Sequence, residues 1–238
     1  MSIDLVIPIF KEAGLGDTLG KLFEQNVIDD VQIIVVEYDP DKKELGKRIV
    51  EKFNEVNNTN IRYLTVNRPG IAYARHVGIM TGQAPIIVNF DGDARFEHAN
   101  GILRMTTPII TGAAVLTCCN NIWDEKEIPT EKAKEMQWMK VIMDQLSKAQ
   151  SNPLYSFLEP GSAIAREAYM FVGGFDDVQK WELLELSGRL FYNYPTMKKY
   201  VSDVNVIVSP RRVLNWTNKT FSMLDYEKFN PRIENRIK

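Results

Sequence analysis

The chain has 238 residues, of which 45% are hydrophobic and 25% charged, and these values are ordinary for a globular protein. A chain of this length can bury about 70% of its unfolded surface, so it does not need disulfides to be stable. Its net charge of −2 excludes a generally basic surface for nucleic acid, and no segment approaches the roughly 18 apolar residues of a membrane-spanning helix. We therefore expect neither a nucleic acid partner nor a transmembrane segment.

The amino-terminal segment and the two cysteines bear on the location of the protein. Residues 1–14 (MSIDLVIPIFKEAG) have no basic region before the apolar run, and this pattern indicates a first strand, not a signal peptide. Cys118 and Cys119 are adjacent within an apolar run, which favours buried, reduced thiols over a disulfide or a zinc site. A cytoplasmic location is expected, and peripheral attachment to a membrane is left open.

Strands and helices are expected to alternate as far as Phe90. The strands are predicted at Ile3–Ile9, Val31–Val36, Ile61–Val66 and Ala84–Phe90, and the helices at residues 17–26, 42–57 and 71–81. Val31–Val36 is a continuous β-branched run, typical of a strand that is buried on both faces. Leu45, Ile49, Phe53 and Val56 are spaced by four, four and three residues, which gives the second helix one apolar face. Asp17 is the expected cap of the first helix.

This alternation predicts an α/β fold with a mainly parallel sheet. In such sheets ligands bind beyond the carboxyl ends of the strands. The residues that follow the strands are therefore the candidates for function. They are residues 8–12, 37–41, 67–70 and 91–95.

The second half of the chain has a less regular pattern. Strands are predicted at residues 112–119, 161–165 and 204–208. A helix is predicted at residues 130–150, and its broad apolar face favours core packing over a contact with a partner or a membrane.

Asp91-Gly92-Asp93 is the sequence most indicative of chemistry. Two carboxylates one residue apart can hold Mg²⁺ or Mn²⁺, which share their other positions with water and substrate phosphates. The spacing alone is weak evidence, because Asp39-Pro40-Asp41 has it as well and surface turns are rich in aspartate. Its position after a buried strand, where a ligand would bind, favours a functional site over a solvated turn.

Four segments, in order, resemble the family 2 glycosyltransferases of the GT-A fold over about residues 3–190. The first two are the opening strand and turn at residues 6–12 (VIPIFKE) and the second strand with its acidic end at residues 33–39 (IIVVEYD). The third, residues 68–78 (RPGIAYARHVG), resembles the G-x-x-x-A-R-N-x-G helix and leads to Asp91 and Asp93. The fourth comprises residues 161–166 (GSAIAR) and 173–177 (GGFDD).

The resemblance implies a nucleotide-sugar site. Pro8 and Glu37 would line the pocket for the base and ribose, with Asp39 as a weaker candidate. Arg68 would lie against the base or the diphosphate, since its cation suits phosphate oxygens. Asp91 would contact the ribose or the metal, and Asp93 would bind the metal, Mn²⁺ or Mg²⁺, on the diphosphate.

An inverting reaction needs a general base for the acceptor hydroxyl. Many family members place an E-D pair after the GGFD sequence, whereas this chain reads WELLEL at residues 181–186, with Leu183 in place of the aspartate. Glu182 is the first candidate for the base and Glu185 the second, although both could be solvated surface residues. Trp181 could form the floor of the sugar site or belong to the core. A retaining mechanism is left open.

Many relatives also have a histidine near the carboxyl terminus as a further metal ligand. Here residues 209–212 read SPRR, without such a ligand. Water or Asp203 could complete the metal site, or Arg211 and Arg212 could replace part of the metal charge at the diphosphate.

We therefore expect a single GT-A domain over residues 1–238, with a nucleotide-sugar-binding half at about 1–119 and an acceptor-binding half at about 120–238. The expected reaction moves a sugar from a UDP- or GDP-sugar to a hydroxyl of a glycan, lipid or protein acceptor. A non-catalytic sugar-nucleotide-binding or scaffold protein is the alternative, favoured by the missing histidine and Leu183. A nucleotidyltransferase fits less well, because the loop after the first strand is not glycine-rich. A homo-oligomer is left open.

Overall fold

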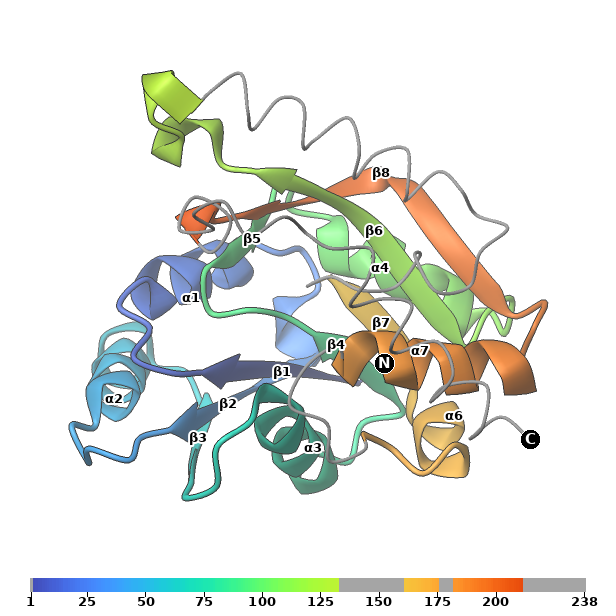
Figure 1. Cartoon of the computed structure of the whole chain (residues 1–238), viewed down its shortest axis with the longest axis horizontal. Coiled ribbons are helices and arrows are strands. Elements are labelled where there is room, and N and C mark those ends of the chain that lie inside the picture. Colours follow the sequence, from blue (N-terminus) through green and yellow to red (C-terminus); the bar gives the residue numbers. More distant parts are fainter. Residues whose placement is uncertain (1, 133–160, 176–181, 212–238) are drawn as a thin grey trace.

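The computed structural model describes residues 2–132, 161–175 and 182–211 (Figure 1). Its helices are α1 (Leu15–Phe23), α2 (Leu45–Asn57), α3 (Ile71–Thr81), α4 (Gly101–Ile110), α6 (Arg166–Phe171) and α7 (Glu182–Asn193), with short 3-10 turns at Ile28–Asp30, Glu125–Glu127 and Thr130–Lys132. Its strands are β1 (Ile3–Ile9), β2 (Val31–Tyr38), β3 (Arg62–Val66), β4 (Ile86–Asn89), β5 (Ala94–Phe96), β6 (Leu116–Trp123), β7 (Ser162–Ala165) and β8 (Lys198–Val208).

These strands form one sheet in the order β3-β2-β1-β4-β7-β6-β8-β5. The first four are parallel, with β1 between β2 and β4. Beyond β4 the sheet is mixed, because β7 is antiparallel to both neighbours while β6 and β8 are parallel. The prediction of a Rossmann-like parallel half that continues into a mixed half is thus confirmed.

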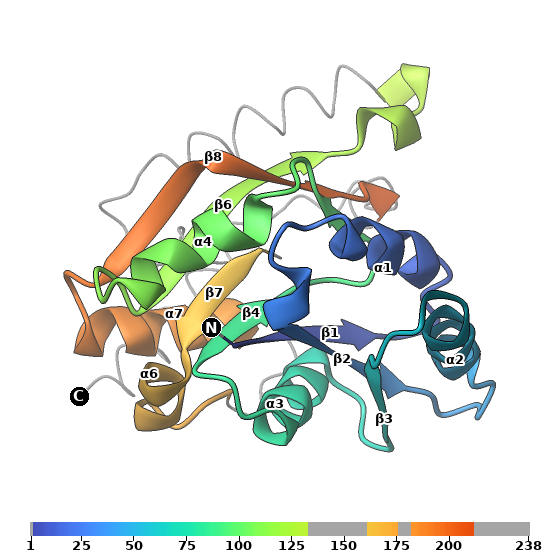
Figure 2. The same cartoon turned by 180° about the vertical axis from the view of Figure 1, so that it is seen from behind.

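The core lies on both faces of this sheet. Every residue of β1 is buried, and successive side chains point to opposite faces. Ile3, Leu5 and Ile7 pack into the cluster under α1, α2 and α4, whereas Val6 packs into the cluster under α3, α6 and α7. Figure 2, the view from behind, shows α4 in front of β6 and β8. A strand covered on both sides requires the continuous apolar pattern seen in the sequence.

Two helix starts differ from the predicted ones. Asp17 is not the cap of α1: the helix begins at Leu15, because the Glu12 carboxylate accepts the Gly14 N–H at 2.9 Å and turns the chain earlier. The second helix begins at Leu45, not near residue 42, because Glu44 is left-handed with φ 51° and donates its N–H to Asp39 at 2.6 Å. Both starts are set by a carboxylate from the preceding loop.

Other elements also differ from the prediction. Helix α4 and strand β5 were not predicted; Pro108 lies inside α4, and a proline usually ends a helix. Strand β8 begins six residues earlier than predicted, at Lys198. Of the helix predicted at residues 130–150, only the turn Thr130–Lys132 falls within the described residues.

The remaining structural expectations concern the thiols and the membrane. Cys118 and Cys119 are buried free thiols, and burial raises the pKa of Cys118 well above its usual value. In the part of the chain that the structure describes, no helix has the length and apolar character needed to cross a membrane.

Candidate functional site

The carboxyl ends of β1, β2 and β4 meet at one edge of the sheet, as the parallel order requires. Ile9 pairs with Glu37, so the loops that follow β1 and β2 start side by side. Val6 pairs with Asn89, which brings the turn after β4 to the same edge. The predicted site residues from these three loops are therefore neighbours, although they are far apart in sequence.

An exposed aromatic surface lies at this edge. Phe10, directly after β1, is 54% exposed and stacks on Tyr38 at the end of β2, with ring centroids 5.7 Å apart. Lys11 lies 5.0 Å from the Phe10 centroid and pairs with Asp41 at 2.8 Å. Exposed ring faces of this kind suit the stacking of a nucleobase. Phe10 and Tyr38 fall within the candidate segments 8–12 and 37–41, but the sequence did not single out either of them.

Pro8, Glu37 and Asp39 lie beside this surface. Pro8 and Glu37 are buried, and Asp39 accepts a hydrogen bond from the backbone N–H of Glu44. Pro8 is buried within β1. Glu37 is 1% exposed and accepts hydrogen bonds from Tyr63 Oη at 2.6 Å and from the Gly46 N–H at 3.1 Å. Burial, and then the hydrogen bond to Glu37, raises the pKa of Tyr63. The Glu37 carboxylate thus joins β2, β3 and α2, and Asp39 orders the loop before α2.

Arg68 lies at the other side of the same edge, after β3. Its side chain is exposed, and the guanidinium carbon is 5.1 Å from the Tyr73 ring centroid. Tyr73 is on the first turn of α3, so this stacking holds the Arg68 guanidinium against the start of that helix.

Asp91 and Asp93 have different partners, although they are only two residues apart. Asp91 Oδ1 accepts from Arg75 Nη2 at 2.6 Å, and the Arg75 side chain is 1% exposed. This buried ion pair joins the turn after β4 to α3. The side chain of Asp93 instead lines the pocket beside α1.

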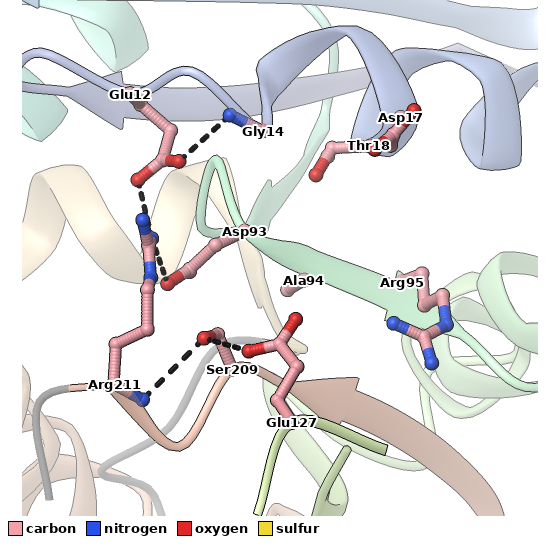
Figure 3. A pocket seen from close by; sticks show the side chains of 10 residues that line it. All are labelled: Glu12, Gly14, Asp17, Thr18, Asp93, Ala94, Arg95, Glu127, Ser209 and Arg211. Carbon is pink, nitrogen blue, oxygen red and sulfur yellow. Dashed lines mark hydrogen bonds and ion pairs between the residues drawn. The ribbon is translucent and has the colours of Figure 1, made fainter. Parts of the chain in front are cut away.

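That pocket has a volume of about 240 Å³ (Figure 3). Its lining combines carboxylates, two guanidiniums and small residues: Glu12, Gly14, Asp17, Thr18, Asp93, Ala94, Arg95, Glu127, Ser209 and Arg211. Arg211 Nη2 lies 2.7 Å from Glu12 Oε2 and 2.7 Å from Asp93 Oδ2. We call this arrangement the Glu12–Arg211–Asp93 bridge. It joins residues that the sequence separates by up to 199 positions.

The bridge counteracts a concentration of negative charge. The pKa of Asp93 is raised, first by burial and also by the neighbouring Asp91 and Glu12 carboxylates, while the hydrogen bond from Arg211 lowers it. Hydrogen bonds to Glu12 and Asp93 raise the pKa of Arg211 above its usual value. A cation at this position is therefore stabilised by two carboxylates together.

The donor set is suitable for a divalent metal, although it is small. Carboxylate oxygens are the ligands that Mg²⁺ and Mn²⁺ prefer, and Asp93 and Glu12 already share one cationic group. Within residues 2–132, 161–175 and 182–211 no group of three or more His, Cys, Asp or Glu could hold a metal. Asp203 does not line the pocket but pairs with Arg104 at 2.9 Å, so the structure does not support it as a further ligand. Arg211 does face Asp93, whereas Arg212 lies outside the described residues.

The glycine turn at Gly173 and Gly174 contacts helix α7, and both lie in the half of the chain for which the sequence predicts the acceptor site. Both glycines have positive φ values, 85° and 71°. Arg189 on α7 donates to the carbonyls of Val172 and Gly174, and it holds both oxygens of Glu185 at 2.6 Å. We call this arrangement the Glu185–Arg189 clamp.

The clamp bears on the choice of base. Glu185 is 5% exposed and both of its oxygens are engaged, which favours Glu182 over Glu185. Glu182 is the first residue of α7, but its side chain and Trp181 lie outside the described part of the chain.

A second contact anchors the same turn. The Tyr169 hydroxyl accepts the Phe175 N–H at 3.1 Å and lies 2.7 Å from His76 Nδ1 on α3. Burial raises the pKa of Tyr169 to about 12, so the phenol stays neutral. The hydroxyl and His76 Nδ1 share a hydrogen bond whose direction depends on the tautomer of the imidazole. The glycine turn is thus connected to α3 as well as to α7.

Solved structures with a similar fold are glycosyltransferases. The mannosyltransferase PcManGT from Pyrobaculum calidifontis, in complex with GDP-Man and Mn²⁺, has a TM-score of 0.69 at 16% identity, over 92% of this chain and 58% of its own. Residues 1–349 of S. aureus TarS, in complex with UDP-GlcNAc, have a TM-score of 0.64 at 12% identity. The match covers 87% of this chain and 58% of the TarS chain. GalNAc-T7 with UDP, GalNAc and Mn²⁺ has a TM-score of 0.66 at 15% identity, and the match covers 88% of this chain and 44% of its own. The chain thus spans about half the length of these proteins.

The sequence comparisons identify the family. A search of curated proteins finds no match to the sequence. Residues 4–172, well over half of the chain, match the model of glycosyl transferase family 2. This range contains the opening strand, the second strand with its acidic end, the α3 helix and the Asp91-Gly92-Asp93 turn, all at the edge described above. The chain therefore belongs to glycosyl transferase family 2.

Proposed function

We propose that the protein transfers a sugar from a UDP- or GDP-sugar to a hydroxyl of a glycan, lipid or protein acceptor. The observation that carries this proposal is the presence at one sheet edge of the exposed Phe10 ring, stacked on the half-buried Tyr38, and of the carboxylate of Asp93, which pairs with a cation. A base and a diphosphate are the two parts of a nucleotide sugar that such groups recognise. The donors in the similar structures are sugar nucleotides, which agrees with this assignment.

Each residue at the nucleotide side has a proposed part. Phe10 and Tyr38 stack on the base, and Pro8, Glu37 and Asp39 shape the pocket behind it. Arg68 lies against the base or the diphosphate. Asp91 contacts the ribose or the metal through the oxygen that Arg75 does not hold.

Asp93 is the proposed metal ligand on the diphosphate. A divalent cation, when bound, neutralises the charge that grows on the leaving diphosphate. Two of the similar structures contain Mn²⁺, which supports Mn²⁺ or Mg²⁺ as the ion.

The proposed acceptor side is built on α7. Glu182 removes the proton of the acceptor hydroxyl while that oxygen attacks the anomeric carbon and the bond to the diphosphate breaks, with inversion. The role of Trp181 in the sugar site stays a prediction, because Trp181 lies outside the described residues. The Glu185–Arg189 clamp holds α7 against the glycine turn and so orients its first residue.

The two halves, residues 1–119 and 120–238, are proposed to act as one domain. One buried cluster contains Ile3 and Leu5 from β1 together with Val204 and Val206 from β8, which supports a common core.

The test of this proposal is the binding of UDP- and GDP-sugars to wild type and to Asp93→Asn, with and without Mn²⁺, by calorimetry. We expect one nucleotide class to bind, Mn²⁺ to strengthen binding by about tenfold or more, and Asp93→Asn to remove that gain. Asp203→Asn is the matched control, because Asp203 is 62% exposed and pairs with Arg104 away from the pocket. Absence of binding to every sugar nucleotide would overturn the proposal, and binding without turnover would indicate a non-catalytic protein.

Phe10→Ala is expected to weaken nucleotide binding by about 1–3 kcal/mol, the usual contribution of stacking between a base and an aromatic ring. The effect should appear equally for the free nucleotide and the sugar nucleotide, because the ring contacts only the base. Calorimetry with both ligands measures it. Phe171→Ala, which removes a 69% exposed phenylalanine on α6, should leave the affinity unchanged. Equal affinity of Phe10→Ala and wild type would place the base elsewhere.

A further inference from the structure

The Glu12–Arg211–Asp93 bridge has one property that the proposed reaction does not use. A single nitrogen, Arg211 Nη2, lies 2.7 Å from an oxygen of each carboxylate (Figure 3). The guanidinium therefore lies where one small cation would contact Glu12 and Asp93 at the same time. Arg211 and such a cation cannot both make these contacts.

The two carboxylates are held by the fold independently of Arg211. Glu12 Oε1 accepts the Gly14 N–H at 2.9 Å, so its other oxygen is left to face Asp93 and Arg211. The turn before Asp93 is fixed by the Gly92 carbonyl, which accepts from Thr18 Oγ1 at 2.8 Å. A Cβ on Gly92 would lie 3.0 Å from Glu12 Cγ, so the turn packs directly against Glu12. The carboxylates are thus positioned before any cation arrives.

Arg211 is held much less firmly than the carboxylates. Its side chain is 50% exposed, whereas those of Glu12 and Asp93 are 14% and 16% exposed. It follows the end of β8 by three residues, and an ion pair of a half-exposed side chain is weakened by the surrounding water. The Arg211 side chain can therefore leave the site at a small cost in free energy. The two carboxylates stay close together, and their mutual repulsion favours the binding of another cation.

A divalent cation offsets this repulsion better than a guanidinium does. It would bring two charges, and it would coordinate the oxygens of Glu12 and Asp93 directly. Water and phosphate oxygens fill the remaining positions. The displaced guanidinium would then be near phosphate oxygens, its preferred partners.

We propose that Glu12 is the second carboxylate of the cation site and that Arg211 occupies this site until a divalent cation displaces it. The inference rests on the proposed function for the identity of the cation as Mn²⁺ or Mg²⁺. It assigns a ligand role to Glu12 and an exchange role to Arg211. One consequence is that loading with metal releases the Arg211 side chain from Glu12 and Asp93.

The test measures binding of Mn²⁺ alone, without any nucleotide, by calorimetry and by the electron paramagnetic resonance signal of the free hydrated ion. Arg211→Ala is expected to bind Mn²⁺ several-fold more tightly than wild type, up to about 30-fold, because a competing group with two ion pairs is gone. Mn²⁺ should also raise the melting temperature of Arg211→Ala more than that of wild type. Arg211→Gln keeps most of the side chain without its charge and gives the same test if the alanine variant folds poorly.

The role of Glu12 is tested in the same assay. Adding Glu12→Gln to Arg211→Ala should remove the gain in affinity for Mn²⁺. Arg95→Ala is the matched control, because it removes the same charge from the same pocket but from a residue paired with Asp124. An unchanged or lower affinity of Arg211→Ala would overturn the exchange, and an unchanged affinity after Glu12→Gln would overturn the ligand role of Glu12.

These outcomes can be separated from failure of the proposed function, because no sugar nucleotide is present. A protein that shows the exchange but binds no sugar nucleotide would keep this inference and lose the proposed transferase activity. The opposite result is also possible to recognise. If nucleotide binding depends on Mn²⁺ and on Asp93, but Arg211→Ala does not change the binding of Mn²⁺ alone, the proposed function is kept and this inference is lost.

Discussion

Replacing Glu182 by glutamine is expected to lower kcat by about 10²- to 10⁴-fold, the usual contribution of a general base. Glutamine has nearly the same shape but cannot accept the acceptor proton. Affinity for the sugar nucleotide should stay at the wild-type value, because Glu182 is proposed to act only on the acceptor. Steady-state kinetics together with calorimetry of donor binding separate the two effects.

Glu167→Gln is the matched control for this experiment. Glu167 is an exposed glutamate on α6, so the same substitution there should leave both kcat and donor affinity unchanged. A loss of kcat below tenfold in Glu182→Gln would show that another group is the base or that the reaction is retaining. Because Glu185 is engaged by Arg189, its replacement is expected to act through the fold and does not serve as a control.

Replacing Arg75 by methionine is expected to lower the free energy of unfolding by about 3–5 kcal/mol. Arg75 is 1% exposed and pairs with Asp91 at 2.6 Å, so its removal leaves a buried carboxylate without its cation. Denaturation in urea measures the loss. The turn that carries Asp93 should also become less well positioned, which predicts weaker donor binding in the same variant.

Two further variants test the cause of that loss. Arg104→Met removes an arginine from an exposed pair with Asp203, and it should cost no more than about 1 kcal/mol. Adding Asp91→Asn to Arg75→Met should recover part of the stability, because the unpaired charge is then gone. A cost of Arg75→Met equal to that of Arg104→Met would mean that the buried pair contributes little.

The layout of the parallel half and the sheet edge that carries the candidate site follow from the sequence alone. Hydrophobic periodicity depends only on which positions face the core, so it was sufficient to predict β1, α3 and the order of elements between them. Because parallel strands end at a common edge, the position of Asp91 and Asp93 after β4 predicted where they would lie. Hydrophobic periodicity could not predict α4, because Pro108 is unfavourable inside a helix. Only the packing of Ile102 and Met105 into the core outweighs the cost of this proline.

Only the tertiary structure decided which side chains meet at that edge. Asp91 and Asp93 are equivalent in the sequence motif, yet one faces Arg75 on α3 and the other faces Arg211, 118 positions away. The sequence offers Glu182 and Glu185 alike as candidate bases, and the contact of Glu185 with Arg189 is visible only in the folded chain. An ion pair depends on distance and burial in three dimensions, and neither quantity follows from residue type or local spacing. For this reason the fold class could be predicted from local patterns, whereas the partners of each charged residue could not.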